Sequence, residues 1–148
     1  DPTNRLEELA QEVVGIMGKF SERFGEPPLK TVNVSPIPGN FGQGFAGMIY
    51  LSTISYLAEG QRPPHAQDAF SKTFYSDMLL AHELAHQWWG NLLTPGDGPG
   101  GNILSEGMSH FSTLLLLEQV KGERARMEFA RRIEERLRAA GARIVAGV

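Results

Sequence analysis

Two histidines and a glutamate stand close together in the segment His82-Glu83-Leu84-Ala85-His86. On an α-helix, histidines four residues apart lie about 40° apart around the axis and about 6 Å apart along it, so both imidazoles can bind one metal ion. Glu83 lies on the same side, where its carboxylate can act as a general base on a water molecule. Two nitrogen ligands and a base are what zinc-assisted hydrolysis requires. The alternative is a helix with two ordinary surface or core histidines.

A third zinc ligand is expected at Glu106, near the start of the next predicted helix. A loop rich in glycine and proline, residues 95–101, separates it from His86. An antiparallel helix pair joined by this loop would bring Glu106 back to the metal. Three protein ligands leave a fourth position open, as in catalytic zinc sites. The alternative for Glu106 is a residue favoured near a helix N-terminus by the helix dipole.

Two other polar residues are candidates for supporting the ligands. His110 follows Glu106 by four residues and therefore lies on the same helix face, one turn further on. It is predicted to contact a ligand or to border the substrate cleft, and the alternative is a partly buried polar residue beside the site. Asp97 is a candidate to hydrogen-bond a ligand imidazole and fix its tautomer. Its alternative is a turn residue between glycines.

The elements that position the zinc ligands are predicted to be helices and short strands. The predicted fold class is therefore α+β, a small β-sheet packed against helices that include the zinc-binding pair. The first helix begins at Thr3 as N-cap and stops at Gly25, before two prolines. Apolar periodicity, turn residues and caps predict further helices from Ser76 to Trp89, from residues 102–105 to Gly122 and over 123–140, and strands over 31–34 and 48–51.

Two details of these helices carry expectations about packing. Gly15 and Gly18 weaken the first helix, which predicts close packing against a neighbour at that point. The third helix is predicted to turn an apolar side inward, formed by Leu104, Met108, Phe111, Leu114 and Leu115.

Composition excludes several classes of protein. The chain has 148 residues, one domain's worth, with 41% hydrophobic and 21% charged residues and no cysteine. Thiolate catalysis, cysteine-based zinc fingers and iron–sulfur clusters are therefore excluded. The net charge of -3 argues against a nucleic-acid partner, and no apolar run reaches the roughly 20 residues of a membrane span.

The segment from His82 to Asn91, with Leu104-Ser105-Glu106-Gly107 after it, resembles the aminopeptidase-N-like zinc metallopeptidases. More broadly it is similar to the thermolysin-type gluzincins, whose third zinc ligand is a glutamate on the following helix. The resemblance implies the N-terminal, zinc-carrying lobe of a thermolysin-like catalytic domain. It also implies that Gly44, Phe45 and Ala46 form a strand edge that binds extended peptide substrate through main-chain hydrogen bonds; the alternative for these residues is a simple bulge.

Two departures from the family pattern shape the functional expectation. Gln43-Gly44-Phe45 stands where aminopeptidases carry a glutamate that holds the substrate's amino terminus. The family's oxyanion-stabilising tyrosine follows the third ligand, whereas the tyrosines of this chain, at positions 50, 56 and 75, precede it. Residues 1–148 are therefore expected to be one lobe of a longer catalytic domain, with the remaining C-terminal part of the polypeptide as its partner and weak activity alone.

The functional prediction is zinc-dependent hydrolysis of a peptide or protein substrate, with Glu83 as general base and His82, His86 and Glu106 as zinc ligands. Two alternatives remain open. One is an inactive, peptidase-like zinc-binding interaction module, and the other is a gluzincin hydrolase that acts on a substrate other than a peptide.

Overall fold

The computed structural model describes residues 5–139, so the predicted cap at Thr3 and the end of the last predicted helix lie outside the described residues. This part of the chain has an α+β fold in which a small mixed sheet packs against helices. The elements, in chain order, are α1 (Leu6–Phe24), β1 (Asn33–Ile37), β2 (Gln43–Phe45), β3 (Met48–Ser52), η2 (Thr53–Tyr56), η3 (Glu59–Gln61), η4 (Pro64–Ala66), α2 (Ala69–Thr73), η5 (Phe74–Met78), α3 (Leu79–Ala85), η6 (Ile103–Gly107), α4 (Met108–Lys121) and α5 (Glu123–Ala139).

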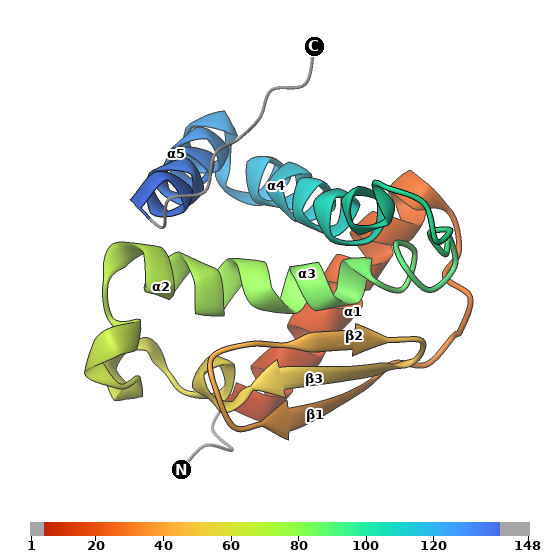
Figure 1. The fold of residues 1–148 in the computed structure, drawn as a ribbon. Helices are drawn as coiled ribbons and strands as arrows, with labels where there is room; N and C mark the ends of the chain where they lie inside the picture. Colours follow the sequence, from red (N-terminus) through yellow and green to blue (C-terminus); the bar gives the residue numbers. More distant parts are fainter. Residues whose placement is uncertain (1–4, 140–148) are drawn as a thin grey trace.

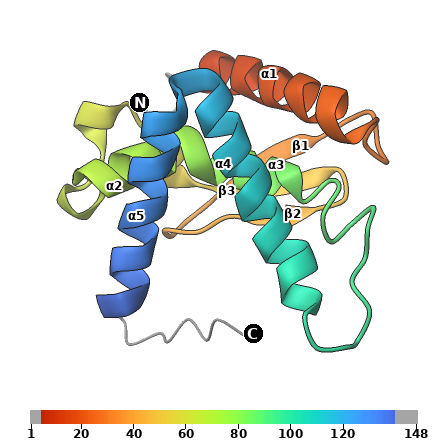
Figure 2. The same ribbon diagram turned by 90° about the horizontal axis from the view of Figure 1, so that it is seen from above.

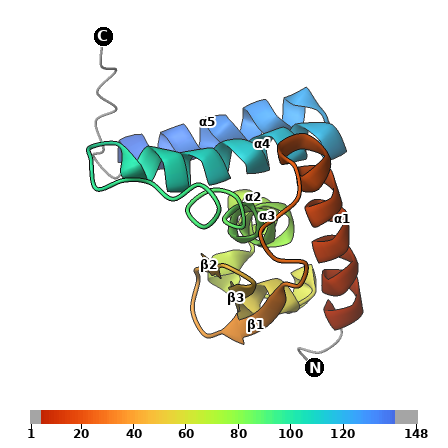
Figure 3. The ribbon, with the colours of Figure 1, turned by 90° about the vertical axis from the view of Figure 1, so that its right-hand side faces the viewer.

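The helical rod α2–η5–α3 lies at the centre of the fold. The sheet packs on one side of it, α4 and α5 lie on the opposite side, and α1 runs along a third side (Figure 1, Figure 3). The strand order is β1-β3-β2, with β1 parallel and β2 antiparallel to β3. From their short connection at Gly122, α4 and α5 diverge over the central rod (Figure 2). The strand β2 is therefore an edge strand that lies beside α3.

The first helix is amphipathic and ends where the sequence predicts. Leu9 and Phe20 are buried in the main core, where Phe20 meets Trp88 edge-on with 5.9 Å between ring centroids. Gly25 ends the helix with a φ of 86°, a conformation that glycine adopts without steric cost. The indole Nε1 of Trp88 donates to the carbonyl of Gly25 at 2.9 Å, so the end of α1 is tied to the segment after α3.

Gly15 and Gly18 do not mark a close approach, which corrects the prediction from sequence. A Cβ built on either residue meets nothing within 4 Å among the described residues. Gly15 instead lines an open, mostly apolar groove of about 250 Å³ between α1, η5 and α4. The groove leaves space where a packed neighbour was expected.

We therefore predict that Gly15→Ala and Gly18→Ala each stabilise the chain, because alanine removes the entropic cost of glycine in a helix interior and clashes with nothing. The expected gain in the free energy of unfolding is about 0.5–1 kcal/mol for each. Urea denaturation of the two variants measures it. A loss of stability would mean that these glycines accommodate a contact that residues 5–139 do not show.

The predicted starts of one strand and one helix are wrong. The strand predicted over 31–34 is shifted, because β1 runs from Asn33 to Ile37 and includes Pro36. Proline fits there because β1 is an edge strand, where a missing N–H need not break a ladder bond. The helix predicted to begin at Ser76 begins at Ala69, capped by Asp68, whose carboxylate accepts from the backbone N–H groups of the first turn. Ser76 lies inside the π-helical turn η5.

The predicted inward side of the third helix is confirmed only in part: Leu114 packs against a core cluster, but Leu104 and Phe111 are exposed. Phe111 is 52% exposed, whereas the residues of α4 that are buried include small hydroxyl side chains. These residues are Ser109, Ser112, Thr113, Leu116 and Leu117. Ser112 Oγ donates to the carbonyl of Met108 and Thr113 Oγ1 to that of Ser109, so each hydroxyl is satisfied inside the helix. Small side chains allow α4 to lie close against α3, and this contact sets which face is buried.

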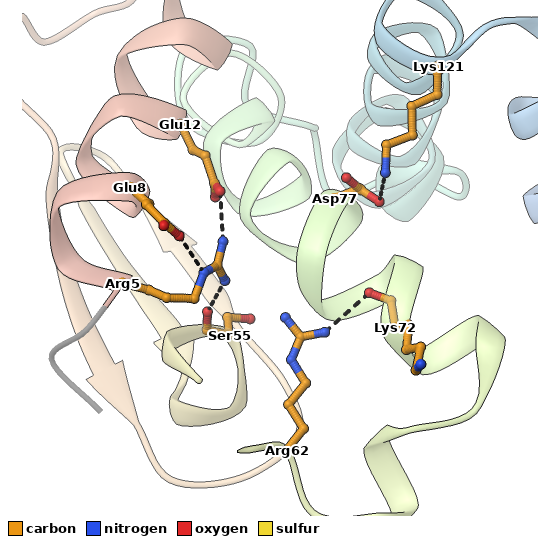
Figure 4. Close-up of polar contacts among 8 residues, drawn as sticks. All are labelled: Arg5, Glu8, Glu12, Ser55, Arg62, Lys72, Asp77 and Lys121. Atoms are coloured by element: carbon orange, nitrogen blue, oxygen red, sulfur yellow. Dashed lines mark hydrogen bonds and ion pairs between the residues drawn. The ribbon is translucent and has the colours of Figure 1, made fainter. Parts of the chain in front are cut away.

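Polar contacts join elements that are distant in sequence (Figure 4). Arg5 at the start of α1 donates to the carbonyl of Ser55 in η2 at 2.7 Å and pairs with Glu12 at 2.8 Å. Lys121 at the end of α4 pairs with Asp77 in η5 at 2.6 Å. These contacts tie the start of α1 to η2 and the end of α4 to η5 of the central rod. No helix in the described part of the chain is long and apolar enough to cross a membrane.

Candidate metal centre

Three side chains from two elements meet at one point, as the sequence predicts. His82 lies on α3, His86 caps its C-terminus and Glu106 lies on η6. The Nε2 atom of His82 is 3.1 Å from Glu106 Oε2, and the Nε2 atom of His86 is 3.5 Å from Glu106 Oε1. One ligand atom from each residue lies within 4.8 Å of the other two. The antiparallel helix pair expected from the loop therefore brings Glu106 back to the histidines.

The turn after α3 differs from the prediction of a helix that continues to Trp89. The helix ends at Ala85, and Gly90 then turns the chain with a φ of 99°. A Cβ at Gly90 would lie 2.8 Å from the hydroxyl oxygen of Ser105, next to Glu106. Asn91 Nδ2 donates to the carbonyl of His86 at 2.7 Å, which satisfies one of the orphan carbonyls at the end of the helix.

Hydrogen bonds to His86 fix which of its nitrogens faces the site. Its Nδ1 lies 2.9 Å from the carbonyl of Trp89 and 3.2 Å from the hydroxyl of Ser109. A carbonyl only accepts, so Nδ1 carries a hydrogen and, in the neutral ring, Nε2 carries the lone pair. That lone pair faces a carboxylate oxygen of Glu106. Two acceptors face each other favourably only when a proton or a metal ion lies between them.

The ring of His82 is held in its neutral form. Burial, together with the neighbouring His110 and His86, lowers the pKa of His82 to about 3. A neutral imidazole is the form that binds metal ions. The set of two imidazole nitrogens and one carboxylate suits Zn²⁺, so the residues present fit the predicted ion.

Glu83 is buried behind these ligands, with its side chain against the strand β2. A Cβ at Gly42 would lie 2.6 Å from Glu83 Oε1, so only glycine leaves room for the carboxylate. Burial, and secondly the negative charge of Glu106, raise the pKa of Glu83 to about 8, against the lowering effect of a backbone hydrogen bond from Gly44. A divalent cation at His82, His86 and Glu106 would lower this pKa by attraction. Glu83 is thus a carboxyl group whose pKa is displaced toward neutrality, as a general base requires.

In the metal-free protein, Glu83→Gln should remove a pH dependence of stability. Glu83 has a higher pKa in the folded chain, about 8, than its ordinary 4.5, so it destabilises the fold progressively as the pH rises from about 4.5 to 8. Glutamine does not ionise. We expect the variant to gain on the wild type by about 1–3 kcal/mol between pH 5 and pH 8, measured by urea denaturation with a chelator present. A stability difference that does not change with pH would contradict the burial of an ionisable Glu83.

The segment Gly44–Ala46, predicted to bind substrate, includes the end of the edge strand β2 and the turn to β3. Phe45 pairs with Met48 across the turn, and ladder bonds alternate along an antiparallel pair, so the backbone groups of Gly44 face away from β3. The backbone hydrogen bond from Gly44 to Glu83 agrees with this direction. The side chains of Phe45 and Ala46 are exposed. The free edge of β2 therefore lies beside the candidate metal centre.

Gln87 connects this strand to the metal-binding helix, a role that the sequence analysis missed. It is 1% exposed, its Oε1 accepts from the N–H of Gly47 at 2.9 Å, and its Nε2 donates to the carbonyl of Phe45 at 2.8 Å. Ser109 was missed as well, although it contacts His86 directly. Its position three residues after Glu106 was the available signal, because that spacing places both residues near the same face of the continuous helix formed by η6 and α4.

The two residues predicted to support the ligands differ in their surroundings. The ring of His110 lies beside that of His82, with 4.3 Å between centroids, as expected for a residue one turn after Glu106. Asp97 is exposed in the loop and makes no hydrogen bond to His82 or His86 in the described part of the chain. The carbonyl of Trp89 and the hydroxyl of Ser109 occupy the position at His86 that Asp97 was predicted to take.

The sequence matches no protein-family model, and no curated protein is significantly similar to it. The functional argument therefore depends on the geometry of His82, His86, Glu106 and Glu83.

Proposed function

We propose that this chain is the zinc-carrying lobe of a metallopeptidase of the thermolysin-like, aminopeptidase-N-like kind. The observation that carries the proposal is the convergence of two imidazole nitrogens and one carboxylate, with a buried glutamate directly after the first histidine. Zinc bound there would supply a Lewis acid that polarises a carbonyl group and makes a water molecule more acidic. A site that only binds zinc has no use for a carboxyl group like that of Glu83.

Metal binding, proton transfer and substrate binding are assigned to different residues of the chain. His82, His86 and Glu106 hold the metal, and Glu106 is 54% exposed, so the site is open to solvent on its side. Glu83 takes a proton from a water molecule and passes it to the leaving amine, for which a pKa near neutrality is favourable. The N–H of Gly44 is taken by Glu83, so the edge of β2 offers the carbonyl of Gly44 as the backbone group to which an extended peptide adds as a further strand. We propose a peptide substrate for this reason.

The proposal predicts separate effects of Glu83 on catalysis and on metal binding. In the complete natural polypeptide that contains this chain, assayed with a peptide library, Glu83→Gln should lower kcat by at least about 100-fold, because the general base is lost. Its zinc content should equal that of the wild type, because Glu83 is not a ligand. Turnover retained in the variant would remove Glu83 from its role. A zinc-loaded wild type that cleaves no peptide would favour a zinc-binding interaction module or another substrate.

A further inference from the structure

The metal-binding helix carries a second row of polar side chains beside its ligands. His82 and His86, four residues apart, both face Glu106. Glu83 and Gln87 have the same spacing, and both make a hydrogen bond to the backbone of β2. Four residues span about 6 Å along a helix, close to the length of two strand residues, so such a row can follow a strand. The helix α3 and the turn after it therefore contact the candidate metal centre on one side and the edge strand β2 on another.

Gln87 holds the hairpin between β2 and β3 at two points of its backbone. Its Nε2 donates to the carbonyl of Phe45 at 2.8 Å, and its Oε1 accepts from the N–H of Gly47 at 2.9 Å. The residue is 1% exposed, so bulk water does not compete for these bonds. The N–H of Gln87 donates to the carbonyl of Leu84 at 3.0 Å, which keeps the residue against the end of α3. Both polar groups of this amide thus fix the hairpin on the metal-binding helix.

The bonds from Gln87 also restrain Gly44, whose carbonyl is the backbone group that β2 offers to an added strand. The N–H of Gly44 donates to Glu83, and the next residue, Phe45, is held by Gln87. The carbonyl of Gly44 lies between these two anchors in the chain. Main-chain hydrogen bonds give strand addition its affinity, so the loss of one anchor should weaken the binding of an extended peptide.

We propose that Gln87 is a positioning residue for the substrate: it holds the carbonyl of Gly44 at a fixed place beside the metal centre and thereby sets the affinity for an extended peptide. The proposal rests on the proposed function, because it requires a peptide to add to β2. It assigns Gln87 no contact with the metal ion or the substrate. A peptide bound in this way gains the same contacts before and during the reaction, so Gln87 should act on KM and not on kcat.

Gln87→Met tests this role in the complete natural polypeptide that contains this chain. Methionine is unbranched and fills the buried space, but it has no N–H to donate and its sulfur is a weak acceptor. Gln119→Met is the matched control, because Gln119 is an exposed glutamine on α4, outside the ligand group. The readouts are KM and kcat for the peptide that the wild type cleaves best from a library, with kcat calculated per bound zinc ion, and the zinc affinity measured by competition with a chelator.

We expect Gln87→Met to raise KM about 10-fold, with kcat per bound zinc and zinc affinity within about twofold of the wild type, and Gln119→Met to change none of them. A role in folding alone would lower the amount of active enzyme and leave KM unchanged, so an unchanged KM would overturn the proposal. A loss of zinc affinity as large as the rise in KM would also overturn it, because Gln87 would then act on the metal centre.

A second variant covers the case in which Gln87→Met yields no zinc-loaded protein. Gln87→Ala leaves room for water to bond the two backbone groups without fixing the hairpin, and the same rise in KM is expected. If neither variant bound zinc, Gln87 would be needed for the fold itself and the proposal would be overturned. A zinc-loaded wild type that cleaves no peptide would overturn the proposed function, and this result would be seen without any variant.

Discussion

Glu106→Gln is expected to lower the affinity of the chain for zinc by at least about 100-fold, since loss of a mere partner of a ligand already costs 10- to 100-fold. Glu106 supplies the carboxylate of the ligand set, and its oxygens lie 3.1 Å and 3.5 Å from the two histidine Nε2 atoms. Glutamine keeps the shape of the side chain but loses its negative charge. Titration with zinc against a competing chelator measures the change.

The effect should be confined to metal binding. Glu106 is 54% exposed, and replacement of an exposed side chain usually changes the free energy of unfolding by no more than about 0.5 kcal/mol. Glu26→Gln is a suitable control, because Glu26 is exposed and lies outside the ligand group. If Glu106→Gln bound zinc as tightly as Glu26→Gln and the wild type, Glu106 would not be a zinc ligand. The alternative from the sequence, a residue favoured near a helix N-terminus by the helix dipole, would then hold.

Gly44→Ala is expected to be among the most damaging single changes of β2. A Cβ at position 44 would lie 2.6 Å from the backbone carbonyl of Glu83 and 2.8 Å from Cβ of His86. Neither atom belongs to the flexible end of a side chain, so β2 or α3 must move. We expect the free energy of unfolding to fall by about 1–3 kcal/mol, as overpacking does elsewhere. Thermal denaturation of the metal-free protein measures the loss.

The same change should weaken zinc binding, because a shift of α3 moves His82 and the C-cap residue His86. Gly60→Ala is the matched control, since a Cβ there meets nothing within 4 Å and the residue has no positive φ. If Gly44→Ala and Gly60→Ala unfolded at the same temperature, the close packing of β2 on α3 would be contradicted, and with it the proposed place of the substrate beside the metal.

The ligand group was predictable because its geometry is local. Two histidines four residues apart share a helix face whatever the rest of the fold does. The role of Glu106 as third ligand could be predicted from one further assumption, that the helix after the glycine-rich loop runs antiparallel to the helix before it. The stops at Gly25 and Gly122 were predictable for the same reason, because a positive φ there depends on the residue itself.

The contacts around the ligands were not predictable, because they depend on which elements pack together. The buried face of α4 carries Ser109 and Ser112 where a hydrophobic pattern favours Phe111 and its neighbours. Close packing on α3 outweighs that pattern: Ser109 reaches His86, and Ser112 accepts from the indole of Trp89 at 2.8 Å. Helix amphipathicity alone contains no information about such partners.

Zinc binding by the purified chain tests the central claim most directly. The chain would be stripped with a chelator, dialysed against a small excess of zinc, and analysed for bound metal beside a His82→Gln/His86→Gln variant. The account predicts about one zinc ion per wild-type chain, as expected for one three-ligand site, and none in the variant. A wild-type chain without zinc, or equal zinc in both proteins, would contradict it.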